Sequence, residues 1–90
     1  MPPRWLLLSR PECHLCEDFE AALREHLGAR PFVLEHASVD ERGEWRMRYG
    51  TRIPVLLDER GRVLAEGIFD PDAFERGLRG RSGQDAILRD

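Results

Sequence analysis

The sequence predicts one α/β domain, built as a four-stranded mixed sheet flanked by three helices. Three observations lead to this fold class. The length of 90 residues allows a single domain with a modest core. Short apolar runs alternate with helical patterns in the first half, and two apolar runs are separated by a tight turn in the second. Hydrophobic residues make up 41% and charged residues 34% of the chain, as in globular proteins.

The first strand and the first helix follow from the apolar pattern. Residues 5–8 are all apolar, and such a short run is typical of a central strand covered on both faces. Between residues 13 and 27 the apolar spacing becomes helical, and Gly28 follows as a natural C-cap. The residues of this helical stripe are Leu15, Phe19, Ala22, Leu23 and Leu27.

A second strand and a short second helix are expected next. The strand opens at residue 32 and ends before Asp40. Residues 40–49 are mostly polar, but Trp45 and Tyr49 are four residues apart and therefore share one helical face. Gly43 is expected to weaken this helix, because glycine is a poor helix former.

The remaining chain predicts a hairpin. Residues 53–57 are an apolar run, residues 62–65 place three apolar residues after Arg62, and the four residues between the two segments have the composition of a tight turn. The two runs are therefore expected to pair as antiparallel strands.

A closing helix begins at Asp70, which is a typical N-cap, followed by Pro71 in the first turn. Its buried stripe consists of Ala73, Phe74 and Leu78. We assign residues 1–80 to the domain and residues 81–90 to a C-terminal tail, in which residues 81–84 are expected to be loop-like and residues 86–88 to dock or fray.

Charge and cysteine usage limit the partners and the compartment. The formal net charge is −3, which argues against binding to nucleic acid, since that requires clustered positive charge. The apolar run near the N-terminus is shorter than the core of a signal peptide and far shorter than a membrane span. We therefore expect a cytoplasmic monomer that does not bind membranes.

The two cysteines, Cys13 and Cys16, form a single Cys-x-x-Cys motif. A bridge between residues this close stabilises little, because it closes almost no loop, so a chemical role is favoured. The pair lies where the first strand meets the first helix, and helix N-termini favour thiolates. Arg10 and His14 add positive charge nearby. Cys13 is thus predicted to be the nucleophile, with Cys16 one turn away to resolve a mixed disulfide.

Two alternatives remain open for this pair. The first is a non-catalytic module that binds a partner or senses redox state. The second is a metal-binding dithiol, in this chain or shared between two chains. A zinc site needs about four ligands, and the remaining candidates, His14, His26 and His36, are not paired in the sequence. We therefore expect no metal within one chain.

Three motifs together resemble those of glutaredoxins and of the small glutaredoxin-like proteins of the thioredoxin superfamily. They are the Cys13-x-x-Cys16 after an apolar strand, Ile53-Pro54-Val55 at the third strand, and Gly67 with Asp70 after the fourth. The likeness covers residues 4 to 79. It implies a thioredoxin-like fold in which a cis Pro54 faces the disulfide and the backbone of Ile53 holds an extended substrate.

The resemblance further implies a thiol-disulfide oxidoreductase that reduces protein disulfides or glutathione mixed disulfides, with a thioredoxin-reductase-type protein as a reductant. No cofactor is expected to be bound. Acidic residues close to the cysteines, Glu12, Glu17 and Asp18, make glutathione a weakly bound co-substrate. The residues assigned to substrate binding are Arg10, His14, Arg52, Ile53, Pro54, Gly67 and Asp70.

Overall fold

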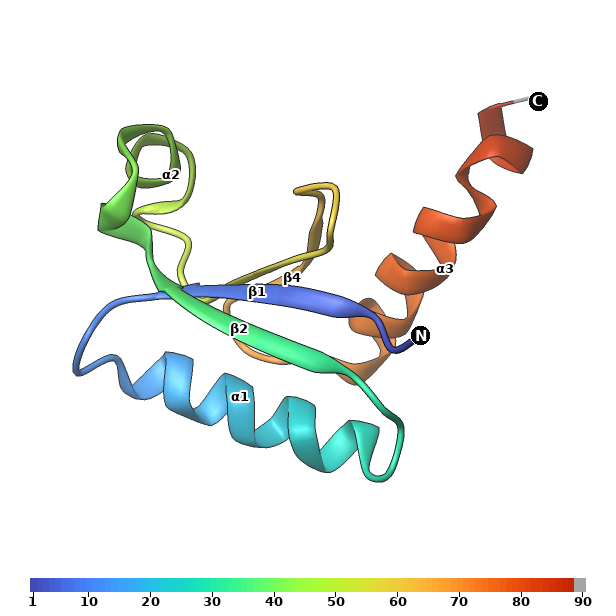
Figure 1. Ribbon diagram of the computed structural model, residues 1–90, viewed down its shortest axis with the longest axis horizontal. Helices are drawn as coiled ribbons and strands as arrows, with labels where there is room; N and C mark the ends of the chain where they lie inside the picture. The colour runs from blue at the N-terminus through green and yellow to red at the C-terminus, as the bar shows by residue number, and fades with distance from the viewer. Residues whose placement is uncertain (89–90) are drawn as a thin grey trace.

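The computed structural model describes residues 1–88, with side chains for residues 1–80. Within this range the chain forms one sheet with α-helices on both sides (Figure 1). The strands are β1 (Arg4–Ser9), β2 (Val33–Ser38), β3 (Val55–Leu57) and β4 (Val63–Glu66). The helices are α1 (His14–Leu27), the short 3-10 helix η1 (Val39–Glu41), α2 (Gly43–Tyr49) and α3 (Pro71–Leu88).

The strand order is β2-β1-β3-β4, with β1 parallel to β2 and antiparallel to β3. The β3–β4 pair is the antiparallel hairpin expected from the sequence. Asp58 closes its turn by accepting backbone hydrogen bonds from Arg60 (2.8 Å) and Arg62 (2.9 Å). The four-stranded mixed sheet with three flanking α-helices is therefore confirmed.

The two faces of β1 belong to two separate cores. Successive residues of a strand point to opposite faces, so Trp5 and Leu7 pack toward α1 and α3 while Leu8 packs toward η1 and α2. The larger core contains Trp5, Leu7, Phe19, Leu23, Leu27, Leu56, Leu64 and Phe74. The smaller core contains Leu8, Val39, Tyr49, Val55 and Leu57. Coverage on both sides explains the uninterrupted apolar run of the first strand.

The expected loop after Gly80 is wrong, because α3 continues to Leu88. Gly80 does not adopt the left-handed conformation in which a glycine ends a helix, and no proline follows it. The start of α3 is as expected, since the Asp70 carboxylate accepts the backbone hydrogen bonds of Asp72 (3.0 Å) and Ala73 (3.3 Å). The boundary of the domain at residue 80 stays a prediction.

Smaller differences affect the first two helices. Leu15 was expected on the apolar face of α1 but is 50% exposed, because it is rotated by about 100° from its neighbour Cys16, which faces the sheet. The expected helix over residues 40–49 is divided into η1 and α2. Gly43 begins α2 rather than interrupting it.

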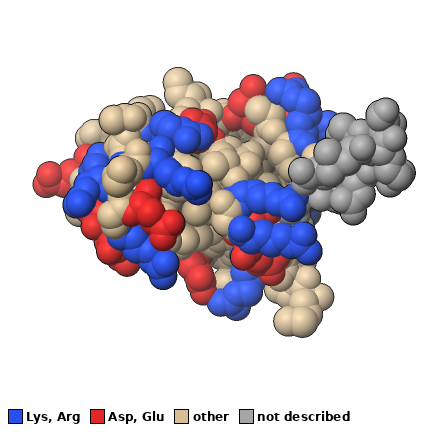
Figure 2. Space-filling view, turned by 90° about the horizontal axis from the view of Figure 1, so that it is seen from above, with Lys and Arg blue, Asp and Glu red and all other residues tan. Residues whose placement is uncertain are grey.

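Basic and acidic side chains are interspersed over the face that carries α2, and neither sign forms one large patch there (Figure 2). Over the described part of the chain, no helix is both long and apolar enough to cross a membrane.

Gly77 allows α3 to approach the sheet closely. A Cβ atom at this position would lie 2.7 Å from the carbonyl oxygen of Leu64 on β4. We therefore expect Gly77→Ala to lower the free energy of unfolding by about 1–3 kcal/mol, although alanine is normally the better helix former by about 1 kcal/mol.

The matched control is Gly80→Ala in the same helix, where a Cβ atom would meet nothing within 4 Å. This variant is expected to be slightly more stable than the wild type. Urea unfolding of both variants measures the difference. Equal stabilisation by the two substitutions would contradict the close packing of Gly77 on β4.

Candidate redox site

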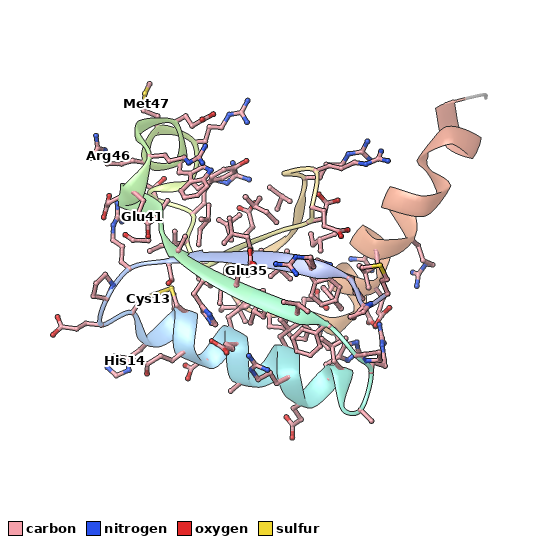
Figure 3. The ribbon with its side chains drawn as sticks, viewed as in Figure 1. Cys13, His14, Glu35, Glu41, Arg46 and Met47 are labelled. Atoms are coloured by element: carbon pink, nitrogen blue, oxygen red, sulfur yellow. A yellow bond between two sulfur atoms is a disulfide. The ribbon has the colours of Figure 1, made fainter. Side chains whose placement is uncertain are left out.

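Cys13 and Cys16 form a disulfide at the N-terminus of α1, with their Cα atoms 5.2 Å apart. Cys13 is the N-cap residue, and its Sγ accepts a hydrogen bond from the backbone N–H of Cys16 at 3.1 Å. Figure 3 shows Cys13 at the end of α1, beneath the loop that follows β1. The motif therefore lies at the carboxyl end of β1, where the sequence placed it.

The two sulfurs differ in their access to solvent. Cys13 is partly exposed, whereas Cys16 is only 5% exposed. A cleft of about 230 Å³ opens beside the disulfide. Its lining residues are Leu7, Ser9, Arg10, Pro11, Glu12, Cys13, Cys16, Glu17, Glu20 and His36. An incoming thiol or disulfide can therefore reach Cys13 more easily than Cys16.

Glu12, which directly precedes Cys13, has a left-handed backbone conformation with φ of 61°. Non-glycine residues seldom adopt this conformation, because their Cβ atom crowds the backbone. The turn that leads from β1 into α1 thus contains a strained residue next to the candidate nucleophile.

The loop before β3 reaches the same edge of the sheet. Leu8 pairs with Val55, so Pro54 lies beside the end of β1, from which the chain continues to the cysteines. The Ile53–Pro54 peptide bond is cis. The carbonyl oxygen of Pro54 accepts a hydrogen bond from the backbone N–H of Gly67 at 2.9 Å, which joins this loop to the segment after β4.

Arg10 connects the cysteine loop to two other elements. Its Nε and Nη2 donate to the Asp40 carboxylate at 2.9 and 3.1 Å, and its Nη1 donates to the Gly50 carbonyl oxygen at 2.7 Å. The hydrogen bonds with Asp40 raise the pKa of Arg10 and hold the pKa of Asp40 below its usual value. The guanidinium is therefore engaged by the protein itself.

Arg52 is engaged in the same way. It donates from Nε and Nη2 to the Glu66 carboxylate, and its guanidinium lies over the ring of Tyr49, 5.3 Å from the centroid. The hydrogen bond from Arg52 lowers the pKa of Glu66. Asp70 in turn caps α3, so Arg10, Arg52 and Asp70, which were assigned to substrate binding, all have partners within the chain.

His14 projects into solvent, with its side chain 96% exposed, and its Nδ1 lies 3.9 Å from the Glu17 carboxylate. Gly67 has φ of +71°, a conformation that glycine adopts without strain. The structure therefore gathers the cysteines and Arg10 around the cleft and joins Gly67 to Pro54, whereas His14 is not among the residues that line the cleft.

Glu20 and His36 line the cleft but were not among the predicted site residues. The Glu20 carboxylate accepts hydrogen bonds from His36 Nε2 at 2.8 Å and from Arg24 Nε at 2.9 Å. Burial raises the pKa of Glu20, but these hydrogen bonds outweigh it and lower the pKa overall. Glu20 could have been found from its position one turn after Cys16 on the same helix.

The three histidines lie apart from one another and each approaches a carboxylate: His14 that of Glu17, His26 that of Glu75, and His36 that of Glu20. Among the side chains that the structure describes, no three histidine, cysteine or acidic residues are grouped so as to hold a metal ion. The expectation that one chain holds no metal stays a prediction.

Comparison with known proteins identifies the family. Two solved structures share 28% sequence identity with this chain and cover 84% of it. Protein Ne2328 from Nitrosomonas europaea has a TM-score of 0.74, with 91% of its chain covered. Protein XcR50 from X. campestris has a TM-score of 0.66, with 96% covered. No curated protein matches the chain.

The model of the glutaredoxin-like domain (DUF836) matches residues 4–76, which is most of the chain. The predicted thioredoxin-like fold is thus confirmed together with the Cys-x-x-Cys motif at the start of α1. The chain belongs to the glutaredoxin-like (DUF836) family of the thioredoxin superfamily.

Proposed function

We propose that the protein is a thiol-disulfide oxidoreductase whose Cys13–Cys16 dithiol reduces protein disulfides or glutathione mixed disulfides. The observation that carries the proposal is the position of the partly exposed Cys13 Sγ at the N-terminus of α1, beside a cleft and bonded to the buried Cys16. Membership of a glutaredoxin-like family supports a redox role for this pair.

In the proposed reaction the reduced protein attacks through the Cys13 thiolate. A bond forms between Cys13 Sγ and one substrate sulfur, and the second substrate sulfur leaves as a thiolate that takes a proton from water. Cys16 then gives its proton to solvent and attacks Cys13 Sγ. This step forms the protein disulfide and releases the remaining substrate sulfur, so two electrons pass from the protein to the substrate.

The helix supplies the charge stabilisation that this chemistry needs. Backbone N–H groups at the start of α1 have no partners within the helix, and one of them, that of Cys16, donates to Cys13 Sγ. Together with the helix dipole they favour the thiolate and lower the pKa of such a cysteine. Cys16 is buried and therefore suited to act second, after Cys13 has bound the substrate.

The other assigned residues are proposed to hold the substrate. The backbone of Ile53 and the ring of Pro54 would bind an extended chain near Cys13, and Gly67 keeps the neighbouring loop in place through its hydrogen bond to Pro54. Glutathione, if used, is proposed to bind weakly, because Arg10, Arg52 and Asp70 are already occupied.

The proposal places a monomeric protein in the cytoplasm, where a thioredoxin-reductase-type protein would restore the dithiol. Two coupled assays test it with the wild-type protein. One follows reduction of a protein disulfide by NADPH and thioredoxin reductase, and the other follows reduction of a glutathione mixed disulfide by NADPH and glutathione reductase. Turnover in either assay supports the proposal, and its absence from both contradicts it.

A further inference from the structure

We propose that the Cys13–Cys16 pair reacts preferentially with polypeptide disulfides whose cysteines are flanked by arginine or lysine. This inference rests on the proposed function and names its substrate class. The cysteine pair is the reacting group, and the charged side chains around it attract or repel an approaching substrate. Two observations support this inference: acidic side chains flank the cysteines, and the nearby arginines are paired with other carboxylates or lie away from Cys13.

The first observation is that acidic residues lie on both sides of the Cys-x-x-Cys motif. Glu12 precedes Cys13 and Glu17 follows Cys16, and both side chains are exposed and line the cleft. Glu12 has no hydrogen-bond or ion-pair partner among the described residues. Within the described residues, the one ion-pair partner of Glu17 is the solvent-exposed His14, whose Nδ1 lies 3.9 Å away and which is positive only when protonated. The mouth of the cleft therefore carries uncompensated negative charge.

The second observation is that the arginines that could neutralise this negative charge are not available to do so. Among the described residues, Arg10 is the one arginine that lines the cleft; its Nε and Nη2 donate to the Asp40 carboxylate and its Nη1 donates to the Gly50 carbonyl oxygen. Arg52 is paired with Glu66. A third arginine, Arg46, lies on α2, away from Cys13 in Figure 3. These three arginines are thus paired with other carboxylates or lie away from Cys13, whereas Glu12 and Glu17 beside the sulfurs are not paired with an arginine among the described residues.

The backbone of Glu12 adds an independent observation. Its left-handed conformation, with φ of 61°, suits glycine far better than glutamate. A charged side chain is therefore kept beside the nucleophile at the expense of backbone strain. Such strain is typical of residues in or next to a functional site.

The test measures oxidation of the reduced wild-type protein by three symmetric peptide disulfides of equal length. Their cysteines are flanked by arginine, glutamine or glutamate. Each rate constant is divided by that of a small neutral thiol with the same peptide, which removes differences in intrinsic reactivity. At low salt we expect the arginine peptide to react at least about tenfold faster than the glutamate peptide, and this ratio to fall toward one in 1 M salt.

A matched pair of variants shows whether the preference arises at the cleft. Glu12→Gln/Glu17→Gln is expected to reduce the arginine-to-glutamate ratio at least about threefold. Glu25→Gln/Glu59→Gln removes the same net charge elsewhere and is expected to leave the ratio unchanged, because Glu59 is exposed in the β3–β4 turn at the opposite end of β1 from the cysteines. Glu25 lies twelve residues beyond Cys13 on α1, about 18 Å away at 1.5 Å per residue, beyond the screening length of about 10 Å in 0.1 M salt.

The outcomes separate this inference from the proposed function. Equal normalised rates for the three peptides, or a preference for the glutamate peptide, would overturn the inference while leaving oxidoreductase chemistry intact. An equal loss of preference in both double variants would also overturn it, because the preference would then reflect net charge alone. No reaction with any peptide would instead contradict the proposed function.

The strained backbone offers a second variant at the same position. Glu12→Gly removes the carboxylate and suits the left-handed conformation, so it is expected to fold at least as well as the wild type. It should show a reduced arginine-to-glutamate ratio, and the single variant Glu12→Gln is expected to show the same. An unchanged arginine-to-glutamate ratio in both single variants would show that Glu12 does not contribute to the preference.

Discussion

Replacement of Cys13 by serine is expected to abolish disulfide reduction, with turnover falling at least about a thousandfold. The Cys13 sulfur is the more exposed of the two and is the acceptor at the start of α1, whereas the sulfur of Cys16 is 5% exposed. A serine hydroxyl at position 13 does not form a thiolate, and only the thiolate attacks a disulfide.

The companion variant Cys16→Ser is expected to behave differently. It retains the attacking sulfur but lacks the resolving one, so it should accumulate a mixed disulfide between Cys13 and the substrate. Mass spectrometry of the unreduced protein measures this adduct. As a control, Leu15→Ser changes an exposed residue between the two cysteines without removing a sulfur and is expected to keep both steps. An active Cys13→Ser variant beside an inactive Cys16→Ser variant would reverse the two roles.

The largest effect on stability is expected from Phe74→Ala. Phe74 is fully buried on α3, and its ring packs against Trp5, His26 and Phe69 at centroid distances of 5.6 to 5.8 Å. Removal of such a ring leaves a cavity and costs about 3–5 kcal/mol. Since small domains are stable by only about 5–15 kcal/mol in total, the melting temperature should fall by at least about 10 °C.

Two further variants control for this effect. Phe74→Leu keeps much of the apolar volume and is expected to lose markedly less stability than Phe74→Ala. Val63→Ala truncates an apolar residue that is 37% exposed at the edge of the sheet, and a small effect is expected there. Thermal unfolding followed by circular dichroism compares all three. A similar loss in Phe74→Ala and Val63→Ala would contradict the central position of Phe74 in the core.

Local patterns in the sequence were sufficient to predict the fold. The apolar run of β1, the helical stripe of α1 and the turn residues before β4 each indicated their element, and the short connection between β3 and β4 determined their pairing. The end of α3 was not predictable in this way. Gly80 ends a helix only if its backbone turns left-handed, and the sequence around it does not determine that choice.

The candidate site was predictable only where it depends on neighbours in sequence. The place of the cysteine pair follows from a strand that leads directly into a helix. The ion pairs of Arg10 with Asp40 and of Arg52 with Glu66 join residues 30 and 14 positions apart, so they depend on how separate elements pack. The contact of His36 with Glu20 likewise requires the β1–β2 register, which places His36 beside Leu7. These contacts determine the charge around the sulfurs.

The capping role of Cys13 links electron transfer to folding. In the disulfide, the Cys13 sulfur is neutral and accepts only a weak hydrogen bond from the Cys16 N–H. In the reduced protein, a Cys13 thiolate is a charged acceptor. Hydrogen bonds to a charged acceptor are roughly twice as strong as those between neutral groups. Reduction should therefore tighten the first turn of α1, and a change that stabilises this turn more in the reduced than in the oxidised protein should favour the reduced state by that difference in free energy. Slower amide hydrogen exchange at Cys16 in the reduced protein would reveal this linkage directly. The first turn of α1 is then both a structural element and part of the thermodynamics of the redox couple.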